Sequence, residues 1–258
     1  MSVRKHLVIP DTQCKPGVPL DHLRWAGNYA AKKKPDVITM IGDFADMESL
    51  SSYDVGKKSF EGRRYAKDVE VAREAMSLLV SPIRAEQERL RSNKEKIWRP
   101  ELYLTLGNHE DRITRAVDSD PKLDGVLKIE DLGYDYFGWK VIPYLEPIVV
   151  DGVSYCHYFT SGVLGRSVTS AQQLLNKKHM SCVMGHVQGR QIAYGVRADG
   201  SQITAIFVGG FYQHDEHYMR WQGNAQTWRG VWMLHQVDNG SFDEMPVSMN
   251  FLRNKYDY

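Results

Sequence analysis

Short apolar runs that end in polar residues recur along the first two thirds of the chain. Residues 7–10, 37–41 and 102–106 are mostly aliphatic, and each run is followed at once by Asp or Gly. Runs of this length and composition are typical of buried parallel strands. Between the first two runs, Asp21 is the expected N-cap of a helix that Pro35 ends, so the pattern predicts a βαβ unit and a parallel sheet.

Residues 62–93 form a long charged segment that is dense in Arg, Lys, Glu and Ala. Its apolar residues recur at the spacing of one helical face, at Val69, Ala72, Met76, Leu79 and Val80. Pro82 should kink or split the helix. Because mixed-sign charge along a helix usually marks a solvated face, we interpret the segment as a helical pair covering one side of the sheet. The alternative is that this helical insertion, around residues 57–96, selects the substrate.

The rest of the chain is mostly β. Asp151-Gly152, between apolar runs at residues 148–150 and 153–158, predicts a tight hairpin. We also expect a loop-rich stretch at residues 118–138, a helix at 169–178, and strands at 182–184, 202–208, 228–236 and 242–247. The sequence contains no internal repeat or low-complexity linker, so residues 1–258 are expected to form a single α/β domain.

Composition narrows the class of protein. The chain has 258 residues, of which 33 are basic and 32 acidic, and its net charge of +1 does not suggest a strongly basic nucleic-acid clamp. No apolar run is long enough to cross a membrane, and the amino terminus lacks the pattern of a signal peptide, so we expect a cytoplasmic protein without membrane contact. Cys14, Cys156 and Cys182 are far apart, which supports neither a disulfide framework nor a cysteine zinc site.

Metal-type ligands stand at five of the predicted strand ends. They are Asp11 with Gln13, Asp43, Asn108, His157, and His186 with Gln188. A lone His after a strand is usually a hydrogen-bonded core residue, but five such ends in one α/β chain are expected to converge at the carboxyl edge of a sheet. Carboxylate, amide and imidazole groups gathered there can hold two divalent ions, which polarise a phosphoryl group and supply hydroxide.

These residues occur in motifs that resemble, in the same order, those of the calcineurin-like metallophosphoesterases, including their small bacterial and phage versions. The motifs span residues 7–190 and are Asp11-x-Gln13, Gly42-Asp43-Phe44-Ala45-Asp46, Gly107-Asn108-His109-Glu110, His157 and Gly185-His186-x-Gln188. The resemblance implies an α/β fold with a two-sheet β-sandwich flanked by helices, arranged α/β/β/α, and a dimetal site at the carboxyl edge of the strands. It also implies a hydrolase in which metal-bound hydroxide attacks a phosphoester, acting in the host cytoplasm if a phage encodes it.

The resemblance gives each of these residues a role. Asp43 would bridge the two ions. One metal site would be completed by Asn108, His157 and His186, and the other by Asp11, Gln13 and Gln188. His109 would protonate the leaving oxygen or steady the phosphoryl charge, with Asp46 orienting its ring.

Two positions depart from the family pattern, and both belong to the same metal site. Gln13 and Gln188 stand where the family usually has His, so neutral amide oxygens replace imidazole nitrogens. An oxygen-rich shell favours Mn²⁺ or Mg²⁺ over softer Zn²⁺, and we expect Mn²⁺, with Mg²⁺, Zn²⁺ or Fe as alternatives. The competing hypothesis is that this site binds metal weakly or not at all.

The residues after Asp46 bear on the substrate. Phosphoprotein phosphatases of the family continue with Arg-Gly, whereas this chain has Met47-Glu48. Arg112 could replace the missing cation at the phosphate or, alternatively, pair with Asp111. We therefore expect a phosphodiester, nucleotide or nucleic-acid substrate. The alternatives are a phosphomonoesterase or phosphoprotein phosphatase, and a non-catalytic binding module with this fold.

Residues 211–229 are rich in aromatic and basic side chains. They form either a loop whose rings pack on the sandwich or one wall of the substrate cleft. In the second case a base stacks on Tyr212, Tyr218 or Trp221 while a phosphate meets Arg220 or Arg229. No role is assigned to His214 and His217. Cys14 is expected to be a small buried residue rather than a reactive one.

Overall fold

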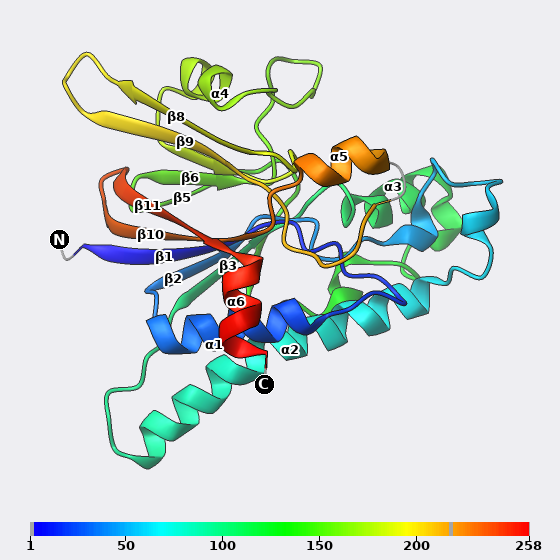
Figure 1. Cartoon of the computed structure of the whole chain (residues 1–258). Helices are drawn as coiled ribbons and strands as arrows, with labels where there is room; N and C mark the ends of the chain where they lie inside the picture. Colours follow the sequence, from blue (N-terminus) through cyan, green and yellow to red (C-terminus); the bar gives the residue numbers. More distant parts are fainter. Residues whose placement is uncertain (1–2, 217–218, 258) are drawn as a thin grey trace.

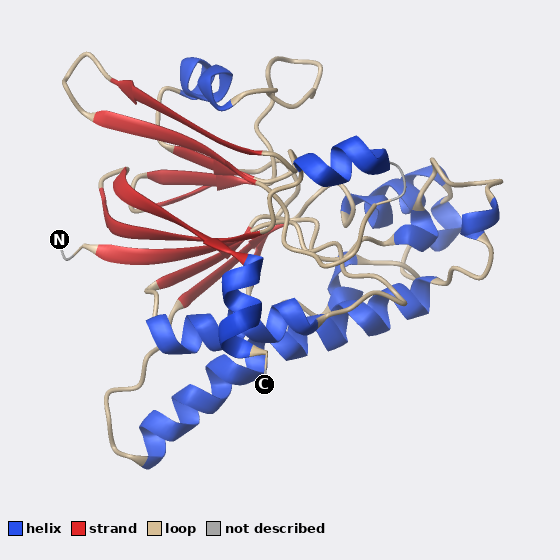
Figure 2. Ribbon diagram, viewed as in Figure 1, coloured by secondary structure: helices blue, strands red, loops and turns tan. Residues whose placement is uncertain are grey.

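Two β-sheets stacked face to face form the centre of the structure, a computed structural model that describes residues 3–216 and 219–257 (Figures 1 and 2). The six-stranded sheet has the order β11-β10-β1-β2-β3-β4, and the five-stranded sheet has the order β5-β6-β7-β9-β8. The strands of the first are β1 (Arg4–Ile9), β2 (Val37–Met40), β3 (Glu101–Thr105), β4 (Lys140–Ile142), β10 (Gly230–Asp238) and β11 (Ser241–Ser248). Those of the second are β5 (Ile148–Val150), β6 (Val153–Cys156), β7 (Cys182–Met184), β8 (Arg190–Val196) and β9 (Gln202–Val208). In the first sheet β1 to β4 run parallel. The parallel sheet formed by β1, β2 and β3 was predicted.

Helices cover the outer face of each sheet. Figure 2 shows helices below the first sheet, where α1 (Asp21–Lys33), α2 (Tyr65–Ser92) and α6 (Met249–Tyr256) lie, and α4 (Ala171–Lys178) above the second. Two further helices, α3 (Asp111–Ser119) and α5 (Arg220–Gln226), lie at the end of the sandwich where the parallel strands terminate (Figure 1). Short 3₁₀ turns are η1 (Glu48–Leu50), η2 (Lys58–Phe60), η3 (Pro121–Leu123) and η4 (Ile129–Leu132). The predicted α/β/β/α fold class is confirmed.

Three apolar clusters correspond to the three interfaces between these layers. In β1, Leu7 and Ile9 pack in the cluster shared with α1 and α2, whereas Val8 points into the cluster between the sheets. Successive strand residues face opposite sides of a sheet, so a strand buried on both faces must be apolar at consecutive positions. β7 follows the same rule, since Val183 faces the other sheet while Cys182 and Met184 face α4.

Pro82 was predicted to kink or split the long charged segment, and the expected split into a helical pair is wrong because the segment folds as one helix. α2 runs unbroken from Tyr65 to Ser92 with Pro82 inside it. Proline removes one helical hydrogen bond at a cost of about 3 kcal/mol. The helix continues because its apolar face packs on α1, where Gly27 lets the helices approach so closely that a Cβ would lie 2.3 Å from the Leu79 carbonyl oxygen.

Other helices and strands begin or end at residues that differ from the predicted ones. Asp21 is the first residue of α1 rather than its N-cap, which is Leu20, and its carboxylate still lies in the first turn where it favours the helix dipole. The hairpin at Asp151-Gly152 is confirmed, as are the strands at 182–184 and 202–208. No prediction was made for α3, α6, β4 or β8. None of the helices in the described part of the chain combines the length and hydrophobicity that a membrane span needs.

His22 makes the stability of the fold depend on pH. Its ring is buried in α1, with Nδ1 3.2 Å from the Gln213 Oε1 and an edge-on contact to Phe211. Burial lowers the pKa of His22 to about 3, whereas an unfolded His titrates near 6.5. Between these values the unfolded chain binds one more proton than the folded one. Stability therefore falls as the pH drops, by about 1.4 kcal/mol per pH unit below about pH 6.

A His22→Asn variant should lose that contribution. We expect the free energy of unfolding, measured by urea denaturation at several pH values between about 6 and 4, to depend on pH less steeply in the variant. The expected difference in slope is about 1.4 kcal/mol per pH unit. Equal slopes in the two proteins would show that His22 is protonated in the folded state.

Candidate metal centre

The predicted ligands lie together at one edge of the sandwich. Asp11, Asp43 and Asn108 follow β1, β2 and β3, while His157 and His186 follow β6 and β7 in the facing sheet. Because the strands of each set are parallel, their carboxyl ends meet at the same edge. A cavity of about 800 Å³ opens there and is lined by Gln13, Asp43, Asn108, His109, Arg112, His186 and Gln188, among others.

Asp43, His157 and His186 form a group that could hold a metal ion. One ligand atom from each lies within 4.8 Å of the others. The Nδ1 of His157 is 2.8 Å from the Ile41 carbonyl oxygen, which fixes the ring with Nε2 facing Asp43 Oδ2 at 3.3 Å. The same Nε2 is 3.0 Å from Asn108 Oδ1, so the amide oxygen lies beside this group as a further donor.

The charges of this group suit a cation. Burial lowers the pKa of His186 to about 4, which leaves its imidazole neutral and free to ligate. Burial also disfavours protonated His157, but the neighbouring Asp43 carboxylate outweighs this and raises the pKa of His157 to about 10. Conversely, burial works against ionised Asp43, but His109 and His157 lower its pKa below the usual range. The buried Asp43 anion thus has a positive charge beside it, and a metal ion would replace the His157 proton in that role.

Asp11, Gln13 and Gln188 form a second cluster of donors beside the first. Asp11 accepts hydrogen bonds from Gln188 Nε2 at 2.8 Å and from the His186 backbone N–H at 3.1 Å. The Oε1 atoms of Gln13 and Gln188 are both buried and lack a hydrogen-bond partner among the described residues. A buried acceptor without a partner costs about 1–3 kcal/mol. Two such oxygens next to a buried carboxylate fit an ion with an oxygen-rich shell.

The backbone at the site is held in unusual conformations. Gln13, Asp43 and His186 have φ values of 43°, 47° and 62°, and non-glycine residues in this left-handed region cost about 1–3 kcal/mol each. Glycines make room for the carboxylates. A Cβ on Gly107 would lie 2.1 Å from Asp43 Oδ1, and one on Gly185 would lie 2.2 Å from Asp11 Oδ1. Three of the predicted ligands are thus held in the left-handed region, as are other residues elsewhere in the chain.

His109 is held beside this cluster by Asp46. Its Nδ1 is 2.8 Å from Asp46 Oδ1, and its Nε2 faces the site 3.7 Å from Asp43 Oδ2. Burial alone would lower the pKa of His109, but Asp43 and Asp46 raise it above its ordinary value. Asp46 has a pKa below its ordinary range because His109, Lys15 and Arg112 outweigh its burial. The two carboxylates therefore favour the protonated form of the imidazole that faces the cavity.

Arg112 points into the same corner, so the predicted alternative in which it pairs with Asp111 is wrong. Its Nη1 is 3.0 Å from Asp46 Oδ1 and 2.8 Å from the Asp46 carbonyl oxygen, and its Nη2 is 3.5 Å from His109 Nε2. Asp111 instead pairs with Arg115, one helical turn further along α3. The guanidinium lines the cavity next to His109.

Glu110 and Lys15 support the site, but the sequence analysis gave neither a role. The Oε2 of Glu110 accepts hydrogen bonds from the backbone N–H groups of Asp43 and Gly107, and its Oε1 accepts one from Ala45. This carboxylate joins the loop after β2 to the loop after β3. The sequence signal that could have indicated this role is the position of Glu110 in the Gly107–Glu110 motif. Lys15 connects Asp46, at 2.9 Å, to Glu216, at 2.7 Å, and no sequence pattern indicated that contact.

Residues 211–229 include a packed ring and an exposed one. Tyr212 is fully buried, whereas Trp221 is 81% exposed. Trp221 is not among the residues that line the metal cavity, so its role in the substrate cleft stays a prediction. Tyr218 and His217 lie outside the described residues. Cys14 is buried, and burial raises the pKa of its thiol to about 12, as expected for a packing residue.

Comparisons with known proteins give little beyond this geometry. No protein-family model matches the chain, and no curated protein matches it. Among solved structures, one crystal structure is 13% identical in sequence, with the alignment covering 96% of this chain and 100% of that chain at a TM-score of 0.38.

Proposed function

We propose that this protein is a metal-dependent phosphoesterase of the calcineurin-like type. It would use two divalent ions, with Mn²⁺ as the expected metal, and a phosphodiester in a nucleotide or nucleic acid as its substrate. The observation that carries the proposal is the pair of buried, unpartnered amide oxygens of Gln13 and Gln188 beside the group formed by Asp43, His157 and His186. A carboxylate, two imidazoles and unpaired oxygens at one cavity are what a divalent pair requires.

Asp43 lies between the two donor clusters and would bridge the ions. One ion would be held by Asn108, His157 and His186, and the other by Asp11, Gln13 and Gln188. Divalent ions in such a site polarise a phosphoryl oxygen and make water a nucleophile at neutral pH.

The proton and the phosphate charge would be handled by residues on the β3 side of the cavity. His109 can donate the proton on Nε2 to the leaving oxygen, because Asp46 accepts from Nδ1 and stabilises the imidazolium. Arg112 keeps N–H groups beside His109 that can bind a non-bridging phosphate oxygen. The distances around His109 and Arg112 support these roles, and so does the order of the motifs that resemble the family.

The walls of the cavity favour a diester with a ring over a phosphoprotein. The cavity is lined by Tyr53, which is 79% exposed, and by Gly223 and Gln226 of α5. Lys57 also lines it and pairs with Asp54 at 2.8 Å. An exposed ring suits a base. Glu48, where a phosphoprotein phosphatase would have the glycine of its Arg-Gly pair, turns toward Arg63 instead.

The test is the hydrolysis of aryl phosphate mono- and diesters by the Mn²⁺-loaded protein. We expect the diester to be the better substrate and His109→Ala to lower its kcat by about 10²–10⁴-fold, the usual loss for a general acid. Faster monoester hydrolysis would identify a phosphomonoesterase. An undiminished rate in His109→Ala would remove His109 from the mechanism. Bound Mn²⁺ without turnover of either ester would identify a binding module.

A further inference from the structure

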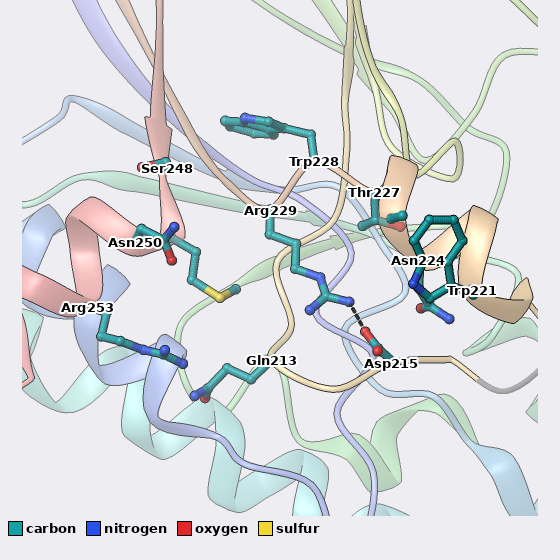
Figure 3. Close-up of a pocket in the computed structure, with 12 residues that line it drawn as sticks. Gln213, Asp215, Trp221, Asn224, Thr227, Trp228, Arg229, Ser248, Asn250 and Arg253 are labelled. Atoms are coloured by element: carbon teal, nitrogen blue, oxygen red, sulfur yellow. Dashed lines mark hydrogen bonds and ion pairs between the residues drawn. The ribbon is translucent and has the colours of Figure 1, made fainter.

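A second pocket, of about 590 Å³, is lined by residues on the face of α5 opposite to the one that lines the candidate metal centre. Figure 3 shows the residues of this pocket. Trp221 and Asn224 line this pocket, whereas Gly223 and Gln226 line the metal cavity. These two pairs lie on opposite faces of a helix with 3.6 residues per turn. We name the second cavity the arginine pocket, after its lining residues Arg229 and Arg253.

The arginine pocket carries positive charge. Figure 3 shows Arg229, just before β10, extending toward Asp215, and Arg253, in α6, extending toward Gln213. Asp215 is the sole carboxylate lining the pocket among the described residues, and it pairs with Arg229 at 2.7 Å. Within residues 3–216 and 219–257, Arg253 has no carboxylate at ion-pair distance and instead stacks over the Trp25 ring at 5.4 Å. One guanidinium is therefore available to an anion.

A large aromatic surface borders the same space. The indole of Trp221 is 81% exposed and lines the pocket. Arg229 also has a buried Nε without a partner among the described residues. An exposed ring beside guanidinium groups matches the chemistry of proteins that bind single strands, in which rings stack on bases and cations hold phosphates.

We propose that the arginine pocket binds one nucleotide unit of a single-stranded polynucleotide, with the phosphate on Arg253 and the base on Trp221. α5 is about 10 Å across, and a stacked strand advances about 3.4 Å per nucleotide. A strand held in the pocket thus reaches the metal cavity within about three nucleotides. The proposal for the arginine pocket rests on the proposed function only because it places the phosphate to be cleaved in the metal cavity. Binding itself needs no turnover.

The test is fluorescence anisotropy of a labelled oligothymidylate strand, with EDTA present so that binding is read without metal. We expect Trp221→Ala and Arg253→Ala each to weaken binding by about fivefold or more. Arg253→Ala should also reduce the slope of log K against log salt by about 0.7, the value for one phosphate contact on a single strand. Both side chains are exposed, and circular dichroism checks that the variants are folded.

The matched controls replace an arginine and an aromatic residue outside the pocket with alanine. Arg84 is an exposed arginine stacked over an aromatic ring, as Arg253 is. Tyr136 is 79% exposed, a fraction similar to the 81% of Trp221. Arg84→Ala and Tyr136→Ala should bind the strand like the wild type. The proposal is overturned if Trp221→Ala and Arg253→Ala also bind like the wild type, or if Arg84→Ala and Tyr136→Ala weaken binding as much as they do. If variant binding is lost while the wild type hydrolyses no phosphoester, the pocket stands and only the proposed function fails.

Discussion

Asp43→Asn should abolish metal-dependent phosphodiester hydrolysis while leaving the fold in place. Asn keeps the shape of Asp but removes the negative charge that lies between the two donor clusters. The backbone N–H of His109, which donates to Asp43 Oδ1 at 2.9 Å, would still find an oxygen. We expect the rate on an aryl phosphodiester to fall by about 10³-fold or more, because the electrostatic stabilisation of the transition state is lost.

The measurement pairs that rate with the Mn²⁺ content of the purified variant. Asp243→Asn, the same change at an exposed position of β11, is the matched control and should behave like the wild type. Circular dichroism and urea denaturation establish that both variants are folded. Full Mn²⁺ content and full activity in Asp43→Asn would exclude Asp43 as a ligand.

Glu110→Ala should be strongly destabilising. The change leaves three buried backbone N–H groups, those of Asp43, Ala45 and Gly107, without their acceptor. Each lost charge-assisted bond leaves a desolvated donor that costs about 1–3 kcal/mol, so we expect the free energy of unfolding to fall by about 3–5 kcal/mol. The loop that carries Asp43 would also lose its link to the loop after β3, so metal binding should weaken as well.

Two further variants make this measurement specific. Glu110→Gln retains one carbonyl oxygen as an acceptor and should lose about half as much stability as Glu110→Ala. Glu88→Ala removes an exposed carboxylate paired with Arg91 and should cost less than about 0.5 kcal/mol in urea denaturation. A loss of this small size in Glu110→Ala would show that water replaces the carboxylate at no cost.

The strands that carry the predicted ligands were predictable from the sequence. β1, β2 and β7 are buried on both faces, so their apolar runs stand out and their ends are marked by Asp11, Asp43 and His186. β8 was missed because it is an edge strand whose residues are mostly exposed, which weakens any apolar pattern. α6 had a usable signal, since Met249, Leu252 and Tyr256 recur on one helical face.

The contacts between distant residues were not predictable in the same way. Arg112 was expected to bind a phosphate or to pair with Asp111, and the ion pair that it makes with Asp46, 66 residues away, was not anticipated. The bond exists because β2 and β3 are neighbours, which local spacing does not reveal. Similarly, the continuity of α2 through Pro82 depends on its packing against Gly27 of α1, a contact the local sequence does not show.

The central claim is that divalent ions held at the ends of β1, β2, β3, β6 and β7 make this protein a phosphodiesterase. The most direct measurement is the rate of aryl phosphodiester hydrolysis by wild-type protein after chelation and after re-addition of Mn²⁺, with bound metal counted in each sample. The account predicts no turnover in the chelated protein and recovery that saturates when two ions are bound per chain. Hydrolysis that persists after chelation, or no hydrolysis with two Mn²⁺ ions bound, would contradict it.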